Sequence, residues 1–76
     1  MYEEIKAIIS DVAGIDASEI THDAQLKKLM DSLTVLEVML AIESRYDIRF
    51  DQCEVERETT VNDVVRAVKI KVAHNV

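Results

Sequence analysis

The fold is decided by one stretch of sequence, DSLTVLEVMLAIESRY, which runs from residue 31 to residue 46. Its first two residues, Asp31 and Ser32, are both favourable at the N-cap of a helix. The apolar residues that follow recur with the helical period of about 3.6 residues. They form two faces, one of Val35, Met39, Ile42 and Tyr46 and the other of Leu33, Leu36 and Leu40. The stretch therefore predicts a helix over residues 32–46.

A chain of this size is not expected to bury both apolar faces of this helix. A helix that is apolar on most sides is normally enclosed all round, but a chain of 76 residues is too small to enclose it. We predict that the Val35 face lies in the core and that the face of Leu33, Leu36 and Leu40 is partly exposed. An exposed apolar patch on a small domain usually marks a partner surface. The alternative is that residues 14–31 cover the leucines.

A helix is also predicted at the start of the chain, where Ile5, Ile8, Ile9 and Val12 recur at helical spacing. Acidic residues occupy its first turn, where the helix dipole favours them, and Gly14 suits a left-handed C-cap. Residues 14–31 lack a clear period and are predicted to form a loop with a short helical turn at residues 16–19. The expected anchors of this loop are Ile15, Ile20, Leu26 and Leu29.

The last third of the chain is harder to interpret. A short helix is expected near residues 52–57, and Thr60 is a suitable N-cap for a helix over residues 60–73 that contains valines at helical spacing. The alternative is a pair of short strands, because residues 46–50 and 68–72 alternate and valine favours strands. The expected core residues of the whole chain are Ile5, Ile8, Val35, Met39, Ile42, Tyr46, Val61, Val65 and Val68.

The composition fits a single domain over residues 1–76. Apolar residues make up 49% of the chain, and no proline and one glycine are too few turn residues for a β-sandwich or small barrel. We expect no secretory signal, because no basic region precedes an apolar run in residues 1–5, and the apolar runs of this sequence are far too short to span a membrane. The single Cys53 is compatible with a reducing compartment. We expect a cytoplasmic, monomeric protein without membrane insertion.

The charge is acidic and unevenly distributed. The formal net charge is −6 at pH 7. Residues 1–60 hold 6 basic and 14 acidic side chains, a net charge of −8, whereas residues 61–76 hold 3 basic and 1 acidic, a net charge of +2. Binding to nucleic acid needs clustered Lys and Arg, so no nucleic-acid partner is expected. An acidic body attracts basic protein partners.

Patterns typical of enzymes and metal sites are missing, so we predict a protein that is not an enzyme and binds no metal. His22 and His74 have no ligand spacing to Cys53, and one glycine excludes a phosphate-binding loop. Ser32 remains, because a phosphodiester on its hydroxyl would lie at a helix N-terminus, where anions are favoured. No histidine or lysine base is adjacent to it, so any reaction of Ser32 requires another enzyme.

Residues 31–43 resemble the acyl carrier protein family, and so do residues 46–48 and the run from Glu58 to Val65. Length, acidity, helix order and the position of Ser32 also agree, so the resemblance covers essentially the whole chain. It implies an all-α four-helix bundle with three longer helices and one short helix. It also implies that Ser32 carries 4′-phosphopantetheine, whose thiol holds acyl groups as thioesters, and that an acyl chain can enter between the helices.

The same resemblance implies the partners. A phosphopantetheinyl transferase would modify Ser32 with the help of Asp31, and acyl-loading and acyl-processing enzymes would dock on the Ser32 helix. The implied docking residues are Leu33, Leu36, Glu37, Leu40 and Glu43.

The chain departs from the usual family pattern at four positions, Leu29, Thr34, Arg45 and Arg49. We therefore predict a specialised lipid, polyketide or related biosynthetic pathway rather than ordinary fatty acid biosynthesis. Two alternatives stay open at this point. The chain is an unmodified helical module that binds a partner through its leucines, or it is a carrier with a tightly packed core and an exposed, polar cargo.

Overall fold

The computed structural model describes residues 1–57 and 60–74. Of residue 74 it describes the backbone alone. Glu58 and Thr59, which belong to the motif quoted above, lie outside the described residues. The elements follow in the order α1 (Tyr2–Ala13), the 3₁₀ turn η1 (Ala17–Glu19), α2 (Leu26–Leu29), α3 (Ser32–Tyr46), α4 (Gln52–Arg57) and α5 (Val61–His74). In this part of the chain, extended backbone pairs once, in an isolated antiparallel bridge between Gln25 and Thr60.

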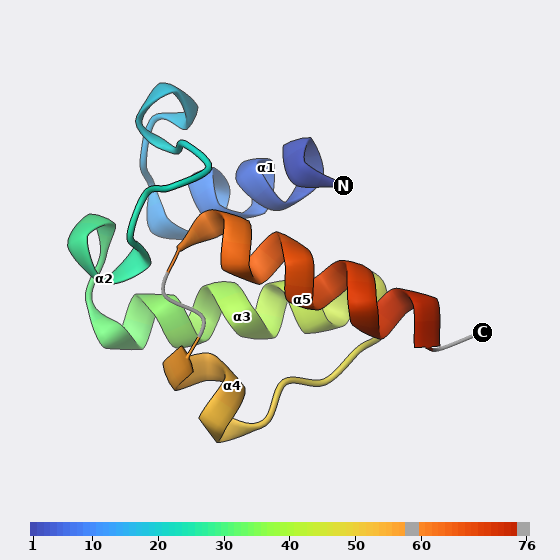
Figure 1. Cartoon of the computed structure of the whole chain (residues 1–76). Coiled ribbons are helices and arrows are strands. Elements are labelled where there is room, and N and C mark those ends of the chain that lie inside the picture. The colour runs from blue at the N-terminus through green and yellow to red at the C-terminus, as the bar shows by residue number, and fades with distance from the viewer. Residues whose placement is uncertain (58–59, 75–76) are drawn as a thin grey trace.

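The all-α prediction is confirmed, with three longer helices and the short α4 where they were expected. The helix α1 packs against α3 and α5, and α4 lies on the other side of the α3–α5 pair (Figure 1). The predicted loop over residues 14–31 needs one correction. It contains η1 near the expected turn, but it also contains the one-turn helix α2, which was not expected.

Local chemistry explains where α1 and α3 end. Gly14 closes α1 with φ of 68°, in the left-handed region, and its N–H donates to the Ser10 carbonyl over 3.0 Å, as the sequence predicted. Asp47 closes α3 in the same conformation, with φ of 55°. Aspartate tolerates the left-handed region better than most residues with a Cβ atom, so the chain turns sharply here and starts toward α4.

The start of α5 is fixed by a reciprocal capping arrangement. The Thr60 Oγ1 accepts from the Asp63 N–H, and the Asp63 carboxylate accepts from the Thr60 N–H, both over 3.1 Å. Thr60 is therefore the N-cap, and the alternative of a strand over residues 68–72 is wrong because these residues lie in α5. The next two N–H groups, of Val61 and Asn62, donate to the carbonyls of Ala24 and His22 over 3.1 and 2.8 Å.

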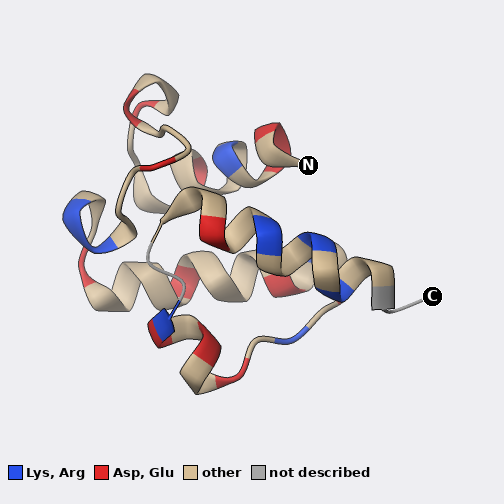
Figure 2. Ribbon diagram, viewed as in Figure 1, with Lys and Arg blue, Asp and Glu red and all other residues tan. Residues whose placement is uncertain are grey.

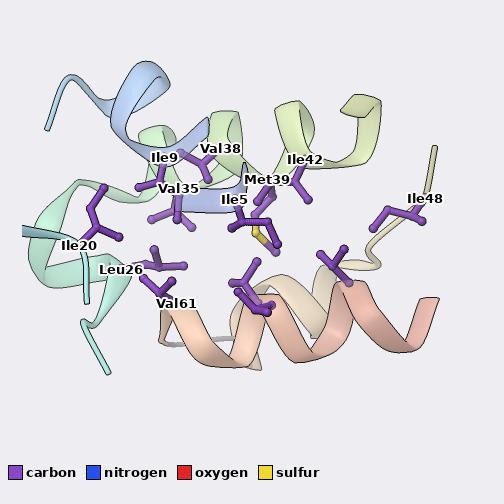
Figure 3. Packing of buried hydrophobic residues seen from close by; sticks show 13 residues of the cluster. Ile5, Ile9, Ile20, Leu26, Val35, Val38, Met39, Ile42, Ile48 and Val61 are labelled. Carbon is purple, nitrogen blue, oxygen red and sulfur yellow. The ribbon is translucent and has the colours of Figure 1, made fainter. Parts of the chain in front are cut away.

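The core lies where α1, α3 and α5 meet, and it is built almost entirely of branched aliphatic side chains (Figure 3). Two expected members are only partly buried, because Ile8 and Tyr46 lie at its edge. Ile9, Val38 and Val64 are fully buried although they are not among the expected core residues. Ile20 and Leu26, expected as anchors of the loop, are buried as well. The buried residues are Ile5, Ile9, Ile20, Leu26, Val35, Val38, Met39, Ile42, Ile48, Val61, Val64, Val65 and Val68.

Candidate functional site

Ser32 is the first residue of α3, and its neighbour Asp31 caps the helix. The Asp31 Oδ1 accepts a hydrogen bond from the Thr34 N–H over 2.8 Å. That hydrogen bond favours the charged carboxylate and holds the pKa of Asp31 below its usual value. The sequence left open which of the two residues caps α3, and the structure assigns the role to Asp31.

Because Asp31 caps the helix, the Ser32 hydroxyl is left free. Ser32 is exposed, and no hydrogen bond within residues 1–57 and 60–74 engages its Oγ atom. The hydroxyl lies at the N-terminus of a 15-residue helix, whose dipole favours a negatively charged group. A phosphodiester on this oxygen is therefore compatible with both the access and the electrostatics of the position.

The second apolar stripe of α3 is exposed, as the sequence predicted. Leu33, Leu36 and Leu40, which we call the leucine face, are 66%, 46% and 54% exposed. Residues 14–31 do not cover them, so the alternative is wrong. Their exposure contrasts with Val35 and Ile42 on the same helix, which are at most 4% exposed.

An apolar groove of about 710 Å³ begins at Ser32 and follows α3. One side is formed by α3 itself, including the leucine face, Met39 and Glu43, and the other by α4 and the segment before it. Arg49 and Glu56 add charge to the lining. The groove places apolar surface directly beside the free hydroxyl, so an apolar chain attached at Ser32 has a surface to bury itself against.

The charged residues around the groove have different surroundings. Glu37 is exposed, whereas Glu43 is half-buried and its carboxylate accepts the Phe50 N–H over 2.6 Å. Of the two arginines that depart from the family pattern, Arg45 in the last turn of α3 pairs with Glu4 of α1 over 2.6 Å, and Arg49 in the segment after α3 lines the groove. Figure 2 shows basic residues on α2, and these are the exposed Lys27 and Lys28.

Within the described residues no cluster of His, Cys, Asp and Glu has the geometry of a metal site. Cys53 is a free, exposed thiol on α4. No helix in the described ranges is long and apolar enough to cross a membrane.

The sequence did not identify the α4 side of the groove. No role in a site was expected for Phe50, Gln52 or Val55, yet all three line the groove with Ser32. The available signal was the isolated apolar pair Phe50 and Val55 in an otherwise polar stretch. Such a pair shows that the segment is anchored, but it does not show which helix it faces.

A small helical bundle with a free serine at the start of its central helix, opening onto an apolar groove, has the form of a carrier domain. Comparison with known proteins agrees. Residues 3–68 match the family model described as the phosphopantetheine attachment site. The chain is 37% identical to the acyl carrier protein of Clostridium acetobutylicum over 71 residues, which covers 91% of this chain and 92% of the relative.

Two further relatives have similar coverage. The acyl carrier protein of Thermotoga maritima is 30% identical, with 93% of this chain and 90% of the relative covered. That of Helicobacter pylori is 31% identical, with 91% of each covered. The chain therefore belongs to the acyl carrier protein family. Its members bear 4′-phosphopantetheine, act with a phosphopantetheinyl transferase and with biosynthetic enzymes, and are carriers rather than catalysts.

Proposed function

We propose that Ser32 is the attachment site of the phosphopantetheine arm and that this protein carries acyl groups in a specialised biosynthetic pathway. The observation that carries the proposal is the free, exposed hydroxyl of Ser32 beside an apolar groove of about 710 Å³. When the arm is attached, its terminal thiol holds the acyl group as a thioester. The protein itself supplies a helix N-terminus for the phosphodiester and an apolar surface for the cargo.

The test of this proposal is intact mass after co-expression with a phosphopantetheinyl transferase. The wild type gains the mass of one phosphopantetheinyl group, and Ser32→Ala gains none. Ser44→Ala is the matched control, because Ser44 is an exposed serine of the same helix. Since Asp31 is the cap, Ser32→Ala changes the free energy of unfolding by less than about 0.5 kcal/mol. Modification of the Ser32→Ala variant, or an unmodified wild type, contradicts the proposal.

Asp31 is proposed to take part in recognition by the transferase as well as in capping. Two substitutions separate these roles, because asparagine caps a helix about as well as aspartate and lacks its charge. Asp31→Asn is expected to slow modification and to lower the melting temperature by only about 1–4 °C, through loss of the charge. Asp31→Ala is expected to slow modification and to lower the melting temperature further, because the cap is lost as well. Unchanged modification rates in both variants would leave Asp31 with the capping role alone.

The leucine face, together with Glu37 and Glu43, is proposed to dock the acyl-loading and acyl-processing enzymes. Exposed leucines supply apolar area to a partner, and the carboxylates attract basic partners from a distance. One Glu43 oxygen is engaged by Phe50, so Glu37 is the more available of the two charges. Leu36→Ala is expected to lower turnover by a partner enzyme, and raised salt is expected to slow the encounter, because the Debye length is about 8 Å at physiological ionic strength.

The groove is proposed to shelter the carried chain. Burial of an apolar chain contributes about 0.8 kcal/mol per enclosed CH₂ before the cost of widening the groove, so the melting temperature is expected to rise with acyl length up to a limit. A flat series of melting temperatures from short to medium chains would favour a small or polar cargo. The departures at Leu29, Thr34 and Arg49 support a specialised pathway.

Residues 1–76 are proposed to form one carrier domain that is monomeric and cytoplasmic. Sedimentation of the modified protein at several concentrations tests the monomer. A mass that rises with concentration contradicts it.

A further inference from the structure

The helix α4 forms one side of the groove although it contains no buried residue. Its apolar contribution is the half-buried Val55, which packs against the core together with Phe50 from the preceding segment. The helices α1 and α3, by contrast, each place several fully buried side chains in the core. Polar contacts must therefore contribute a larger part of the stabilisation of α4 than of α1 and α3.

Two of these polar contacts are local to the groove. Asp51 and Glu54 form a reciprocal capping arrangement, in which the Glu54 N–H donates to Asp51 over 2.7 Å and the Asp51 N–H donates to the Glu54 carboxylate over 3.1 Å. The Glu43 carboxylate of α3 accepts the Phe50 N–H over 2.6 Å. The first contact shapes the start of α4, and the second ties the segment before it to α3.

The third contact joins α4 to α5. The Lys71 Nζ lies 2.9 Å from the Glu54 carboxylate and 5.5 Å from the centre of the Phe50 ring. The two side chains of this ion pair are 24% and 22% exposed, much less than the 58% and 47% of the Arg45–Glu4 pair between α3 and α1. Lower exposure reduces screening by solvent and salt, so the Lys71–Glu54 pair is the better placed of the two to fix a helix.

The position of α4 matters because hollows lie on both of its sides. The groove of about 710 Å³ separates it from α3, and a second hollow of about 410 Å³ lies between α4 and α5. Glu54 and Lys71 both line the second hollow. A shift of α4 toward α5 would widen the first hollow at the expense of the second, and the Lys71–Glu54 pair links the two elements that border that second hollow.

We propose that the ion pair between Lys71 and Glu54 determines the size of the group that the groove accepts, by fixing the distance of α4 from α3. The proposal rests on the proposed carrier function and adds a size-determining contact to it. Lys71 acts here as a positioning residue. It holds Glu54 of α4 by charge and Phe50 of the groove lining by the attraction between its ammonium group and the ring.

The first test uses the unmodified protein and is independent of the carrier function. Amide hydrogen exchange is measured for residues 50–57 in four variants. Lys71→Met removes the charge, Glu54→Gln removes the ion pair but keeps an acceptor for the Asp51 N–H, Lys71→Arg keeps the cation, and Glu4→Gln is the control in a distant ion pair. Exchange is expected to quicken about two- to tenfold in the first two variants only. Equal exchange in all four overturns the proposal.

The second test uses the modified protein loaded with saturated acyl groups of increasing length. The melting temperature is measured for each length in the wild type, Lys71→Met, Glu54→Gln and Glu4→Gln. The length that gives the greatest stabilisation is expected to move downward by about two carbons in Lys71→Met and Glu54→Gln, because loss of the attraction toward α5 lets α4 settle toward α3 and each CH₂ needs enclosed volume. The Glu4→Gln profile is expected to match the wild type.

The outcomes separate this proposal from the one it rests on. An unmodified wild type in the mass spectrum contradicts the carrier function. The hydrogen-exchange test still decides, in that case, whether the Lys71–Glu54 pair holds α4 in place. A modified wild type with the same optimal length in all variants overturns the size-determining role. If Lys71→Met does not fold, Glu54→Gln gives the decision, because it keeps the capping oxygen and changes only the charge.

Discussion

The two sides of α3 are joined to their neighbours by different kinds of contact. On the side of α1 and α5, Val35, Val38 and Ile42 are at most 4% exposed and the contacts are apolar. On the side of α4, the facing helix buries no residue and is held largely by hydrogen bonds and an ion pair. Met39 belongs to both sides, since it is 2% exposed and also lines the groove. Burial of apolar side chains thus stabilises the side of α1 and α5. On the other side, α4 is held by polar contacts, so its distance from α3 can change at a lower cost.

The largest expected difference between the two sides is the cost of shortening a side chain of α3. Ile42→Ala removes a fully buried side chain and is expected to lower the free energy of unfolding by about 2–5 kcal/mol. Leu36→Ala removes one that is 46% exposed and is expected to cost less than about 1 kcal/mol. Urea unfolding measures both. If Leu36→Ala costs as much as Ile42→Ala, the leucine face is part of the core.

A smaller effect is expected where α3 meets the segment before α4. Glu43→Ala removes the carboxylate that accepts the Phe50 N–H over 2.6 Å and is expected to cost about 1–2 kcal/mol. Exchange of the Phe50 amide hydrogen is expected to quicken in parallel. Glu43→Gln is the control, because its amide oxygen still accepts. Loss of stability without faster exchange at Phe50 would show that Glu43 acts elsewhere.

The N-terminus of α3 is expected to add a modest, pH-dependent contribution. Because the folded pKa of Asp31 is lowered, its stabilisation is present above the unfolded pKa of about 4 and is lost as the pH falls through the folded pKa. At neutral pH, Asp31→Asn is expected to lower the melting temperature by about 1–4 °C. Thermal unfolding of both proteins against pH checks this. A difference that persists at a pH low enough to protonate Asp31 in the folded protein contradicts it.

The smallest effect is expected for the exposed ion pair that joins α3 to α1. Glu4→Gln breaks the Arg45–Glu4 pair, whose side chains are 58% and 47% exposed, and is expected to cost less than about 0.5 kcal/mol. The Tyr46 hydroxyl keeps an acceptor in this variant. Chemical unfolding at low and high salt is the measurement. A cost above that of Glu43→Ala would reverse the comparison between the two sides.

The periodic part of the fold could be predicted from the sequence, because a helix of several turns repeats its pattern often enough to be recognised. The helix α3 has the predicted bounds of 32 and 46. The one-turn helix α2 has no room for a period, and it was missed. Val38 was missed for another reason. The helix α3 is covered from two directions, by α1 and by α5, so its buried sector is wider than a single stripe.

The site could be predicted only in part for the same physical reason. The position of Ser32 follows from the local chemistry of a helix start, and the exposure of the leucine face follows from the limited size of the core. The groove does not follow from either. It arises because the left-handed turn at Asp47 sends the chain back along α3, and because Glu43 then binds the Phe50 N–H. Both are three-dimensional contacts with no periodic signature.

The hydrogen bonds from Val61 and Asn62 to the carbonyls of Ala24 and His22 have a consequence for the order of assembly during synthesis. The segment between η1 and α2 has no such donors for these two carbonyls until the start of α5 has been made. Closing a loop of this length costs more entropy than forming the local turns of α1 or α3. On the ribosome, we therefore expect the segment that leads through α2 to Ser32 to be fixed last. Under the proposed function, recognition of Ser32 by a phosphopantetheinyl transferase would then require a nearly finished chain.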